Sequence, residues 1–261
     1  MVMPLILKEI DGRLGTITLN NPEKRNCLSA ALIDEFCSAL DEFEKAGVRV
    51  VILRAAPGVK VWSSGYDVNE LPHPGRDPLP YSAPFGLLLR RVQSYPGPVI
   101  AMIEGSVWGG GCDLALTCDI LIGTDTASFT VTPAKIGIPY TASGMIHFIN
   151  ILGLNKAKEM FFTAAPVNAR DALNAGILNH LVPASDLEHF TRELAKKVIE
   201  NAPLAVTAFK EQFTLLSKGH SIDAETAERI QSLRRVVYDS EDYGEGIQAF
   251  HEKRSPRFKG K

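Results

Sequence analysis

The sequence lacks the signals that mark membrane, secreted and nucleic-acid-binding proteins. No apolar run reaches the roughly 18 residues of a membrane-spanning helix. The N-terminus has neither the basic region nor the long apolar region of a signal peptide. The formal net charge is −2 and no basic cluster stands out, whereas nucleic-acid binding calls for a basic face. We therefore expect no membrane or nucleic-acid partner, and a cytoplasmic location.

Several catalytic and cofactor motifs are missing as well. There is no Gly-x-Gly-x-x-Gly loop, no Gly-x-x-x-x-Gly-Lys-Ser/Thr loop and no Gly-x-Ser-x-Gly elbow of a serine hydrolase. The histidines have no metal spacing, so we predict neither a metal ion nor a separate cofactor. Because Cys-x-x-Cys spacing is also absent, we expect buried free thiols at Cys27, Cys37, Cys112 and Cys118.

What is present is an alternation of strand-like and helical patterns, which predicts an α/β fold. A chain of 261 residues can bury one large core and still carry an appendage. The clearest helix begins at a Ser29 cap and ends at Gly47, with one apolar stripe. The predicted strands are Leu14–Leu19, Val48–Arg54, Val99–Ile103 and Ile120–Gly123.

Two further regions differ from this alternating pattern. Prolines crowd the segment from Ala55 to Pro98, which we interpret as a long loop acting as a substrate lid. After Asn201 the strands are finished, and apolar residues at helical spacing predict helices over Leu204–Leu216 and Ile222–Val237. We therefore divide the chain into a core of residues 1–200 and a helical segment of residues 201–261.

The most informative segment is Glu104-Gly-Ser-Val-Trp-Gly-Gly-Gly-Cys-Asp113. Its three glycines lie between a buried strand and a helix predicted over Cys112–Cys118, where they let a ligand approach the backbone amides closely. The earlier segment Ser63-Ser-Gly-Tyr-Asp67 can bring a second N–H to the same point. Two such donors would make an oxyanion hole; a tight structural turn is the alternative.

Together these segments resemble the paired oxyanion-hole motifs of the crotonase (enoyl-CoA hydratase/isomerase) family. The resemblance extends over almost the whole chain, through Asn21–Leu28, Ala169–Ile177 and Phe250–Arg254. It implies a spiral core of ββα turns, a C-terminal helical trimerisation domain, and a homotrimer or dimer of trimers. A terminal helical pair packed only on its own core is the alternative for the last segment.

The family's hydratases use two carboxylates, one as acid and one as base. The position of the first is occupied here by Asp113, one methylene shorter than the usual glutamate, and that of the second by Pro133. A hydratase would therefore lack one catalytic group. Asp113 could hold a water molecule or cap the helix.

A decarboxylating branch of the family fits the missing base better. The segments Gly105–Gly109, Gly75–Leu79 and Val237–Tyr243, with Thr132-Pro133 and Pro139-Tyr140, resemble the branch that converts methylmalonyl-CoA to propionyl-CoA. By this resemblance the Tyr66 and Gly110 amides hold the enolate, and the Tyr140 hydroxyl orients the departing carboxylate. Tyr66 stands where the branch has histidine, and Tyr140 could instead be a wall residue with its hydroxyl in water. Reprotonation would come from Tyr140 or water.

The resemblance also assigns an acyl-CoA thioester as substrate. The residues expected to hold it are Lys24, Arg25, Cys27, Ser64, Gly65, Asp67, Val68, Asp113, Thr132 and Lys253. Lys253 would reach a CoA phosphate, either in its own or in a neighbouring subunit, since lysine suits phosphate as a compact charge; alone it would be an ordinary surface charge. An enoyl-CoA hydratase or isomerase using Asp113, and a non-catalytic acyl-CoA-binding protein, are the competing hypotheses.

Overall fold

The structure is a computed structural model that describes residues 3–217 and 224–260. It contains two sheets. The larger has the order β1 (Ile6–Asp11), β2 (Leu14–Leu19), β3 (Val50–Ala55), β5 (Val99–Ile103), β7 (Ile120–Gly123) and β10 (His180–Leu181). The smaller has the order β4 (Val61–Ser63), β6 (Ser106–Trp108), β8 (Ser128–Thr130) and β9 (Val167–Asn168).

Helices alternate with the strands over most of the chain, and helices alone form its C-terminal part. They are α1 (Ala30–Lys45), α2 (Pro84–Gln93), α3 (Gly110–Thr117), α4 (Ala142–Thr163), α5 (Ala169–Asn174), α6 (Leu187–Ile199), α7 (Pro203–Ser217), α8 (Ala224–Tyr238) and α9 (Glu241–His251). Short 3-10 turns cover Pro22–Lys24, Val68–Glu70 and Pro133–Ile136. Among the described residues, no helix is both long and apolar enough to cross a bilayer.

The chain winds in repeated turns, each made of two strands and one helix. Strands β3 and β4 lead to α2, β5 and β6 to α3, and β7 and β8 to α4, with each pair placing one strand in each sheet. Within each sheet these successive strands run parallel. The predicted spiral of ββα turns is therefore confirmed.

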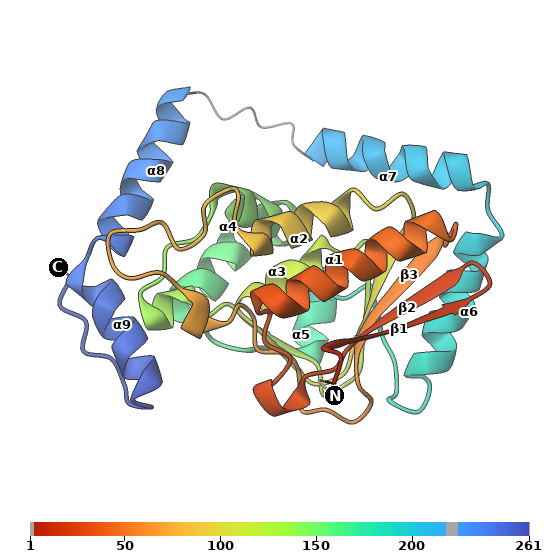
Figure 1. The fold of residues 1–261 in the computed structure, drawn as a ribbon, viewed down its shortest axis with the longest axis horizontal. Helices are drawn as coiled ribbons and strands as arrows, with labels where there is room; N and C mark the ends of the chain where they lie inside the picture. Colours follow the sequence, from red (N-terminus) through yellow and green to blue (C-terminus); the bar gives the residue numbers. More distant parts are fainter. Residues whose placement is uncertain (1–2, 218–223, 261) are drawn as a thin grey trace.

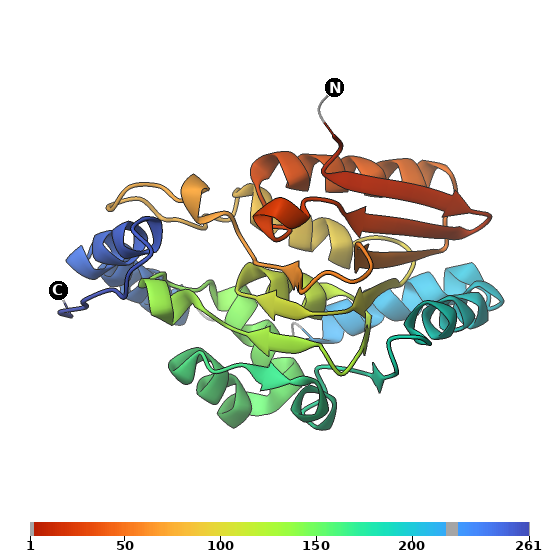
Figure 2. The ribbon, with the colours of Figure 1, turned by 90° about the horizontal axis from the view of Figure 1, so that it is seen from below.

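Both faces of the larger sheet are covered. On β3, Val51 and Leu53 join the core that includes α1 and α2, whereas Val50 and Ile52 face α6. Alternate residues point to opposite faces of a strand, so burial on both sides gives the continuous apolar run that is typical of parallel sheets. Figures 1 and 2 place α6 at one end of the molecule and α8 with α9 at the other.

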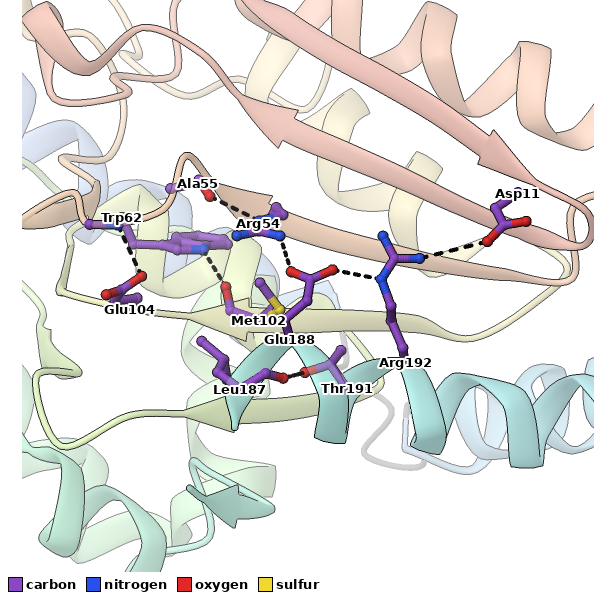
Figure 3. Close-up of polar contacts among 11 residues, drawn as sticks. Asp11, Arg54, Ala55, Trp62, Met102, Glu104, Leu187, Glu188, Thr191 and Arg192 are labelled. Atoms are coloured by element: carbon purple, nitrogen blue, oxygen red, sulfur yellow. Dashed lines mark hydrogen bonds and ion pairs between the residues drawn. The ribbon is translucent and has the colours of Figure 1, made fainter. Parts of the chain in front are cut away.

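A chain of charged side chains fixes α6 on its face of the sheet (Figure 3). The Arg54 guanidinium of β3 pairs with Glu188, and Glu188 accepts a hydrogen bond of 2.6 Å from Arg192. Arg192 lies 3.9 Å from Asp11 at the end of β1. Because Glu188 is 43% exposed, pairs of this kind contribute little net stability, and their effect is to orient the helix.

The predicted helix after Ser29 is confirmed as α1. The Ser29 hydroxyl accepts the Leu32 N–H at 3.3 Å, and the expected stripe is buried. Beyond the end of the helix, Gly47 has φ +71°, a conformation open to glycine because it has no Cβ. The strands predicted at residues 14–19, 99–103 and 120–123 have these bounds, and the strand predicted at residues 48–54 occupies Val50–Ala55.

Three sequence predictions were wrong in part. The proline-rich segment contains β4 and the helix α2, because Pro84 occupies the first turn of α2, where its missing N–H has no partner to lose. Its longest irregular stretch is residues 71–83. Helix α3 begins at Gly110 rather than Cys112. Cys37 is a free thiol as predicted, but it is only partly buried.

The C-terminal helices do not pack as a pair, so that alternative is wrong: α7 and α8 lie apart in both views (Figures 1 and 2). Helix α7 is fixed by polar contacts. Thr207 donates to the Pro96 carbonyl at 2.8 Å, and Lys210 donates to Gly97 O at 3.0 Å and to Asp119 at 2.8 Å. Helix α8 is described from Ala224, so the predicted start at Ile222 lies outside the described residues.

Candidate active site

A cavity of about 690 Å³ opens where the two segments singled out in the sequence meet. Ligand pockets of small molecules and cofactors commonly fall in the range of about 300–1,000 Å³. Eleven predicted site residues line it: Lys24, Arg25, Cys27, Ser64, Tyr66, Asp67, Val68, Gly110, Asp113, Thr132 and Tyr140.

Two backbone amides converge on one point of this cavity. A Cβ built on Gly110 would lie 3.2 Å from the Tyr66 nitrogen, and one built on Gly65 would lie 2.8 Å from the Gly110 nitrogen. Gly65 has φ +86°, and a Cβ there would also lie 2.5 Å from the Trp108 carbonyl oxygen. Only a residue without a side chain permits this approach.

The local hydrogen bonding leaves both amides free. Leu28 forms a parallel bridge with Tyr66, in which the Leu28 N–H bonds to Gly65 O and the Asp67 N–H bonds to Leu28 O. The Tyr66 N–H therefore takes no part in the bridge. Gly110 is the first residue of α3, where an N–H has no partner within the helix. Among residues 3–217 and 224–260, neither amide has an acceptor.

Such a pair of donors can stabilise a negatively charged oxygen. The Gly110 N–H lies at the N-terminus of α3, where the helix dipole adds to the attraction. The two donors come from strand ends of the same sheet, since β4 and β6 run side by side and in parallel. The arrangement has the geometry of an oxyanion hole.

Asp113 is buried opposite a tyrosine hydroxyl. The side chain is 3% exposed, and its Oδ2 accepts a hydrogen bond from the Tyr140 hydroxyl. Its Oδ1 is buried with no hydrogen-bond partner in the described part of the chain. Asp113 makes no capping contact with α3, so the capping alternative is wrong. The alternative that places the Tyr140 hydroxyl in water is also wrong.

Burial controls the protonation of this pair. It raises the pKa of Asp113 to about 7, although the hydrogen bond from Tyr140 opposes the rise. The pKa of Tyr140 lies well above its ordinary value because of burial and the nearby Asp113 carboxylate. Near neutral pH, Asp113 therefore exchanges a proton while Tyr140 keeps its own.

Aromatic rings pack the two sides of the site. The Tyr66 and Phe85 rings meet edge to face at 5.9 Å between centroids. The Tyr140 ring packs the same way against Phe161 at 4.8 Å and Phe148 at 6.2 Å. The Tyr140 ring is thereby fixed with its hydroxyl directed at Asp113.

Two of the predicted residues lie outside the cavity lining. Gly65 acts through its backbone, as described above. Lys253 is exposed, has φ +54° and does not line the cavity within one chain. Its predicted contact with a phosphate stays a prediction.

Several other residues that line the cavity were not predicted from the sequence. They are chiefly Leu71, Leu79, Phe85, Lys135 and Phe250. Leu71, Leu79 and Phe85 belong to the segment interpreted as one loop, in which no periodicity indicates which side chains face inward. For Lys135, only the charge of its side chain could have indicated a role in the site. Phe250 was named only as part of the segment Phe250–Arg254 that resembles the family.

Residues 9–261 match the model of the enoyl-CoA hydratase/isomerase family. The chain is 43% identical over 248 residues to the methylmalonyl-CoA decarboxylase of Escherichia coli K12, with 95% of each chain covered. It is 30% identical over 258 residues to the short-chain-enoyl-CoA hydratase of Clostridium acetobutylicum, again with 95% of each covered.

The fold matches a solved structure of methylmalonyl-CoA decarboxylase in complex with 2-nitronate-propionyl-CoA. The TM-score is 0.96 at 42% identity, and the match covers 98% of this chain and 99% of that one. The similarity therefore includes the whole arrangement of strands and helices around the cavity.

The raised pKa of Asp113 predicts a specific pH dependence of stability. The unfolded chain releases this proton near pH 4 and the folded chain near pH 7, so the folded state binds more protons in between. The free energy of unfolding should therefore fall between these pH values, by an amount on the order of a few kcal/mol. In Asp113→Asn this fall should be absent.

Urea denaturation of both proteins at fixed protein concentration, in steps from pH 4 to pH 8, measures the effect. The difference between the two curves removes the contribution of the other carboxylates. A difference in the free energy of unfolding that stays constant across this range would show that folding does not raise the pKa of Asp113.

Proposed function

The chain belongs to the enoyl-CoA hydratase/isomerase family, and we propose that it is a decarboxylase that converts methylmalonyl-CoA to propionyl-CoA and CO2. One observation favours this reaction over the other reactions of the family. The cavity has the two convergent amides and Asp113, but Pro133 stands where the second acid of the family's hydratases would be. The Asp67 carboxylate also lines the cavity, but it already accepts hydrogen bonds from the backbone and side-chain amides of Asn69. Addition of water to a double bond needs an acid and a base, whereas loss of CO2 needs no base.

The amides of Tyr66 and Gly110 bind the thioester carbonyl oxygen. When the C–C bond to the carboxylate breaks, its electron pair moves into the thioester and charge develops on this oxygen. Donors that are already in place stabilise that charge without reorganising, and one such donor is worth about 2.7–4 kcal/mol. CO2 leaves, and the enolate takes up one proton at the α-carbon, so that the net reaction consumes one proton. The donor is Tyr140 or water.

The protonation state of Asp113 sets what Tyr140 can do. A tyrosine hydroxyl has one proton to donate, and in the structure it goes to Asp113. When Asp113 is ionised, the substrate carboxylate meets an occupied donor and a like charge. When Asp113 is protonated, the pair has a second proton, and one O–H is free to hold the substrate carboxylate with its C–C bond perpendicular to the thioester plane. Orientation of this kind is a major source of rate.

The surroundings favour the departure of CO2. Trp108, Ile136 and Ile138 line the cavity, and an apolar wall disfavours a full carboxylate charge more than the dispersed charge of the transition state. Lys24, Arg25 and Lys135 also line the cavity and supply cations that suit the phosphates of CoA. The thioester itself accepts the electron pair, so we propose that no cofactor is required beyond the CoA of the substrate. The cytoplasmic location stays a prediction.

We also propose that the chain assembles as a homotrimer or a dimer of trimers. Helix α7 is fixed by polar contacts and has no buried residue, and its apolar side chains face outward. Exposure ranges from 51% to 84% for Leu204, Phe209, Phe213, Leu215, Leu216, and for Leu233 and Val236 of α8. Large apolar patches that are exposed to solvent mark protein interfaces.

The oxyanion hole can be tested by adding one methyl group. In Gly110→Ala the new Cβ would lie 3.2 Å from the Tyr66 nitrogen and 3.0 Å from the Phe85 ring, inside the space between the two donors. The kcat for methylmalonyl-CoA should fall by about 10²-fold or more, while the unfolding midpoint changes little. Gly244→Ala is the control, because its Cβ would make an ordinary contact of 3.5 Å with Pro74. Full activity of a folded Gly110→Ala protein would place the oxyanion hole elsewhere.

Two substitutions distinguish decarboxylase from hydratase. Tyr140→Phe removes the hydroxyl and keeps the ring packing, so kcat for methylmalonyl-CoA should fall about tenfold or more, since a hydrogen bond to a charged group is worth about 1.5–3 kcal/mol. Asp113→Asn resembles the protonated acid, so it should keep most of the activity at pH 6. It should also abolish the loss of activity that the wild type shows as the pH rises through about 7.

The same proteins are assayed with crotonyl-CoA. Strong hydration by the wild type, abolished in Asp113→Asn and unchanged in Tyr140→Phe, would favour the hydratase. Binding of both thioesters without turnover of either would favour a non-catalytic acyl-CoA-binding protein.

The assembly is tested by sedimentation equilibrium. The wild type should have the mass of three or six chains of 28.5 kDa at micromolar concentration. Phe213→Glu should shift this equilibrium toward smaller species, because it places a charge in the apolar patch. A wild-type protein that is monomeric under these conditions would rule out the trimer.

A further inference from the structure

One wall of the cavity is an irregular segment, residues 71–83, which we call the wall loop. It contributes Leu71 and Leu79 to the lining and leads into α2, which contributes Phe85. Within residues 71–83 the structure has no helix or strand. A segment without regular secondary structure must be fixed by contacts with its neighbours if its side chains are to form a wall of constant shape.

The wall loop is held from outside the core by α8. The Arg234 guanidinium pairs with both carboxylate oxygens of Asp77, with 2.8 Å between Nη1 and Oδ2. The Arg234 Nη2 also donates to the Leu79 carbonyl at 3.2 Å, and the Leu79 N–H donates to Asp77 Oδ1 at 3.0 Å. Both backbone groups of Leu79, a cavity-lining residue, are therefore fixed by this ion pair.

Two more contacts fix the same side of the wall loop. The Gly75 N–H donates to the Tyr238 carbonyl at the end of α8 at 3.1 Å. The Tyr243 hydroxyl of α9 donates to the Pro72 carbonyl at 3.0 Å, and Tyr243 is fully buried. In Figures 1 and 2 the orange loop accordingly lies against the blue α8 and α9.

The ion pair between Arg234 and Asp77 contributes little to the net stability of the fold. Arg234 is 6% exposed, and the cost of removing a buried pair from water offsets most of the attraction between the charges. Its Nε is buried without an acceptor among the described residues, which adds a further cost. The planar Arg234 guanidinium instead fixes the orientation of the Asp77 carboxylate and the Leu79 carbonyl, because it binds both in one geometry.

We propose that Arg234 is a positioning residue of the acyl-CoA pocket, which through Asp77 and the Leu79 backbone holds the wall loop in place. This inference rests on the proposed function only for the identity of the ligand. Arg234 is not among the residues that line the cavity, so it acts through Leu79. Its removal should weaken substrate binding and leave the chemical step nearly unchanged.

The first experiment measures hydrogen exchange and needs no ligand. In Arg234→Gln the amides of Gly75 and Leu79 should exchange at least about tenfold faster than in the wild type, as expected when local hydrogen bonds open more often. Exchange in α6 should not change. Arg235→Gln is the matched control, because the neighbouring arginine is exposed. Equal exchange of the wall loop in Arg234→Gln and wild type would overturn the proposal.

The second experiment separates binding from chemistry. For methylmalonyl-CoA, KM should rise about tenfold in Arg234→Gln, as expected for loss of a hydrogen bond to a charged group, while kcat stays within about threefold. Arg234→Lys keeps the charge but loses the fork, and it should restore only part of the lost affinity. The double variant Arg234→Gln/Asp77→Asn should be no worse than either single variant, because one interaction is removed in each case. Additive losses, or a fall in kcat with KM unchanged, would overturn the positioning role.

Calorimetric binding of propionyl-CoA separates this proposal from the proposed function. Wild type that binds propionyl-CoA without decarboxylating methylmalonyl-CoA would refute the proposed reaction. The positioning role of Arg234 would then still be decided by the propionyl-CoA affinities of the variants. Unchanged affinity in Arg234→Gln together with faster exchange of the wall loop would refute the role in the pocket.

Discussion

The site depends on the close approach of two backbone segments, at Tyr66 and Gly110. Their amide nitrogens can share one target only because neither Gly65 nor Gly110 carries a Cβ, which would lie within 2.8–3.2 Å of the other segment's amide nitrogen. The spiral of strands brings these segments together, since β4 and β6 are parallel neighbours and both lead into the site. The fold thus supplies fixed donors that require no charged side chain.

The second feature of the site is an acid kept away from water. Asp113 lies in the first turn of α3 and faces Tyr140, whose ring is held by Phe148 and Phe161. Burial raises the pKa of Asp113 to about 7, so one proton is available to the pair at neutral pH. A single acid with a neighbouring hydroxyl suits a reaction that orients a carboxylate and takes up one proton, and it does not suit one that needs a separate base.

The C-terminal helices α7 and α8 are held by polar contacts and expose apolar side chains. Helix α7 is anchored by Thr207 and Lys210 and leaves its apolar side chains exposed. Helix α8 directs Arg234 inward to the wall loop, while Leu233 and Val236 on the same helix are exposed. Polar contacts thus fix the position of these helices, and their exposed apolar residues form the surface that the proposed assembly would bury.

The sequence by itself determined four of the strands, the helix α1 and the two glycine-containing segments, because periodicity, caps and glycine act locally. The resemblance to the family predicted the ββα spiral. It also selected Tyr140 and Asp113, but not their contact, which joins residues 27 positions apart. The proline-rich segment was misread because a proline in the first turn of a helix resembles one in a loop. Only the tertiary structure paired Arg234 with Asp77, 157 positions apart, and buried Asp113 deeply enough to raise its pKa. Both depend on which surfaces exclude water, and that is decided by the packing of the whole chain.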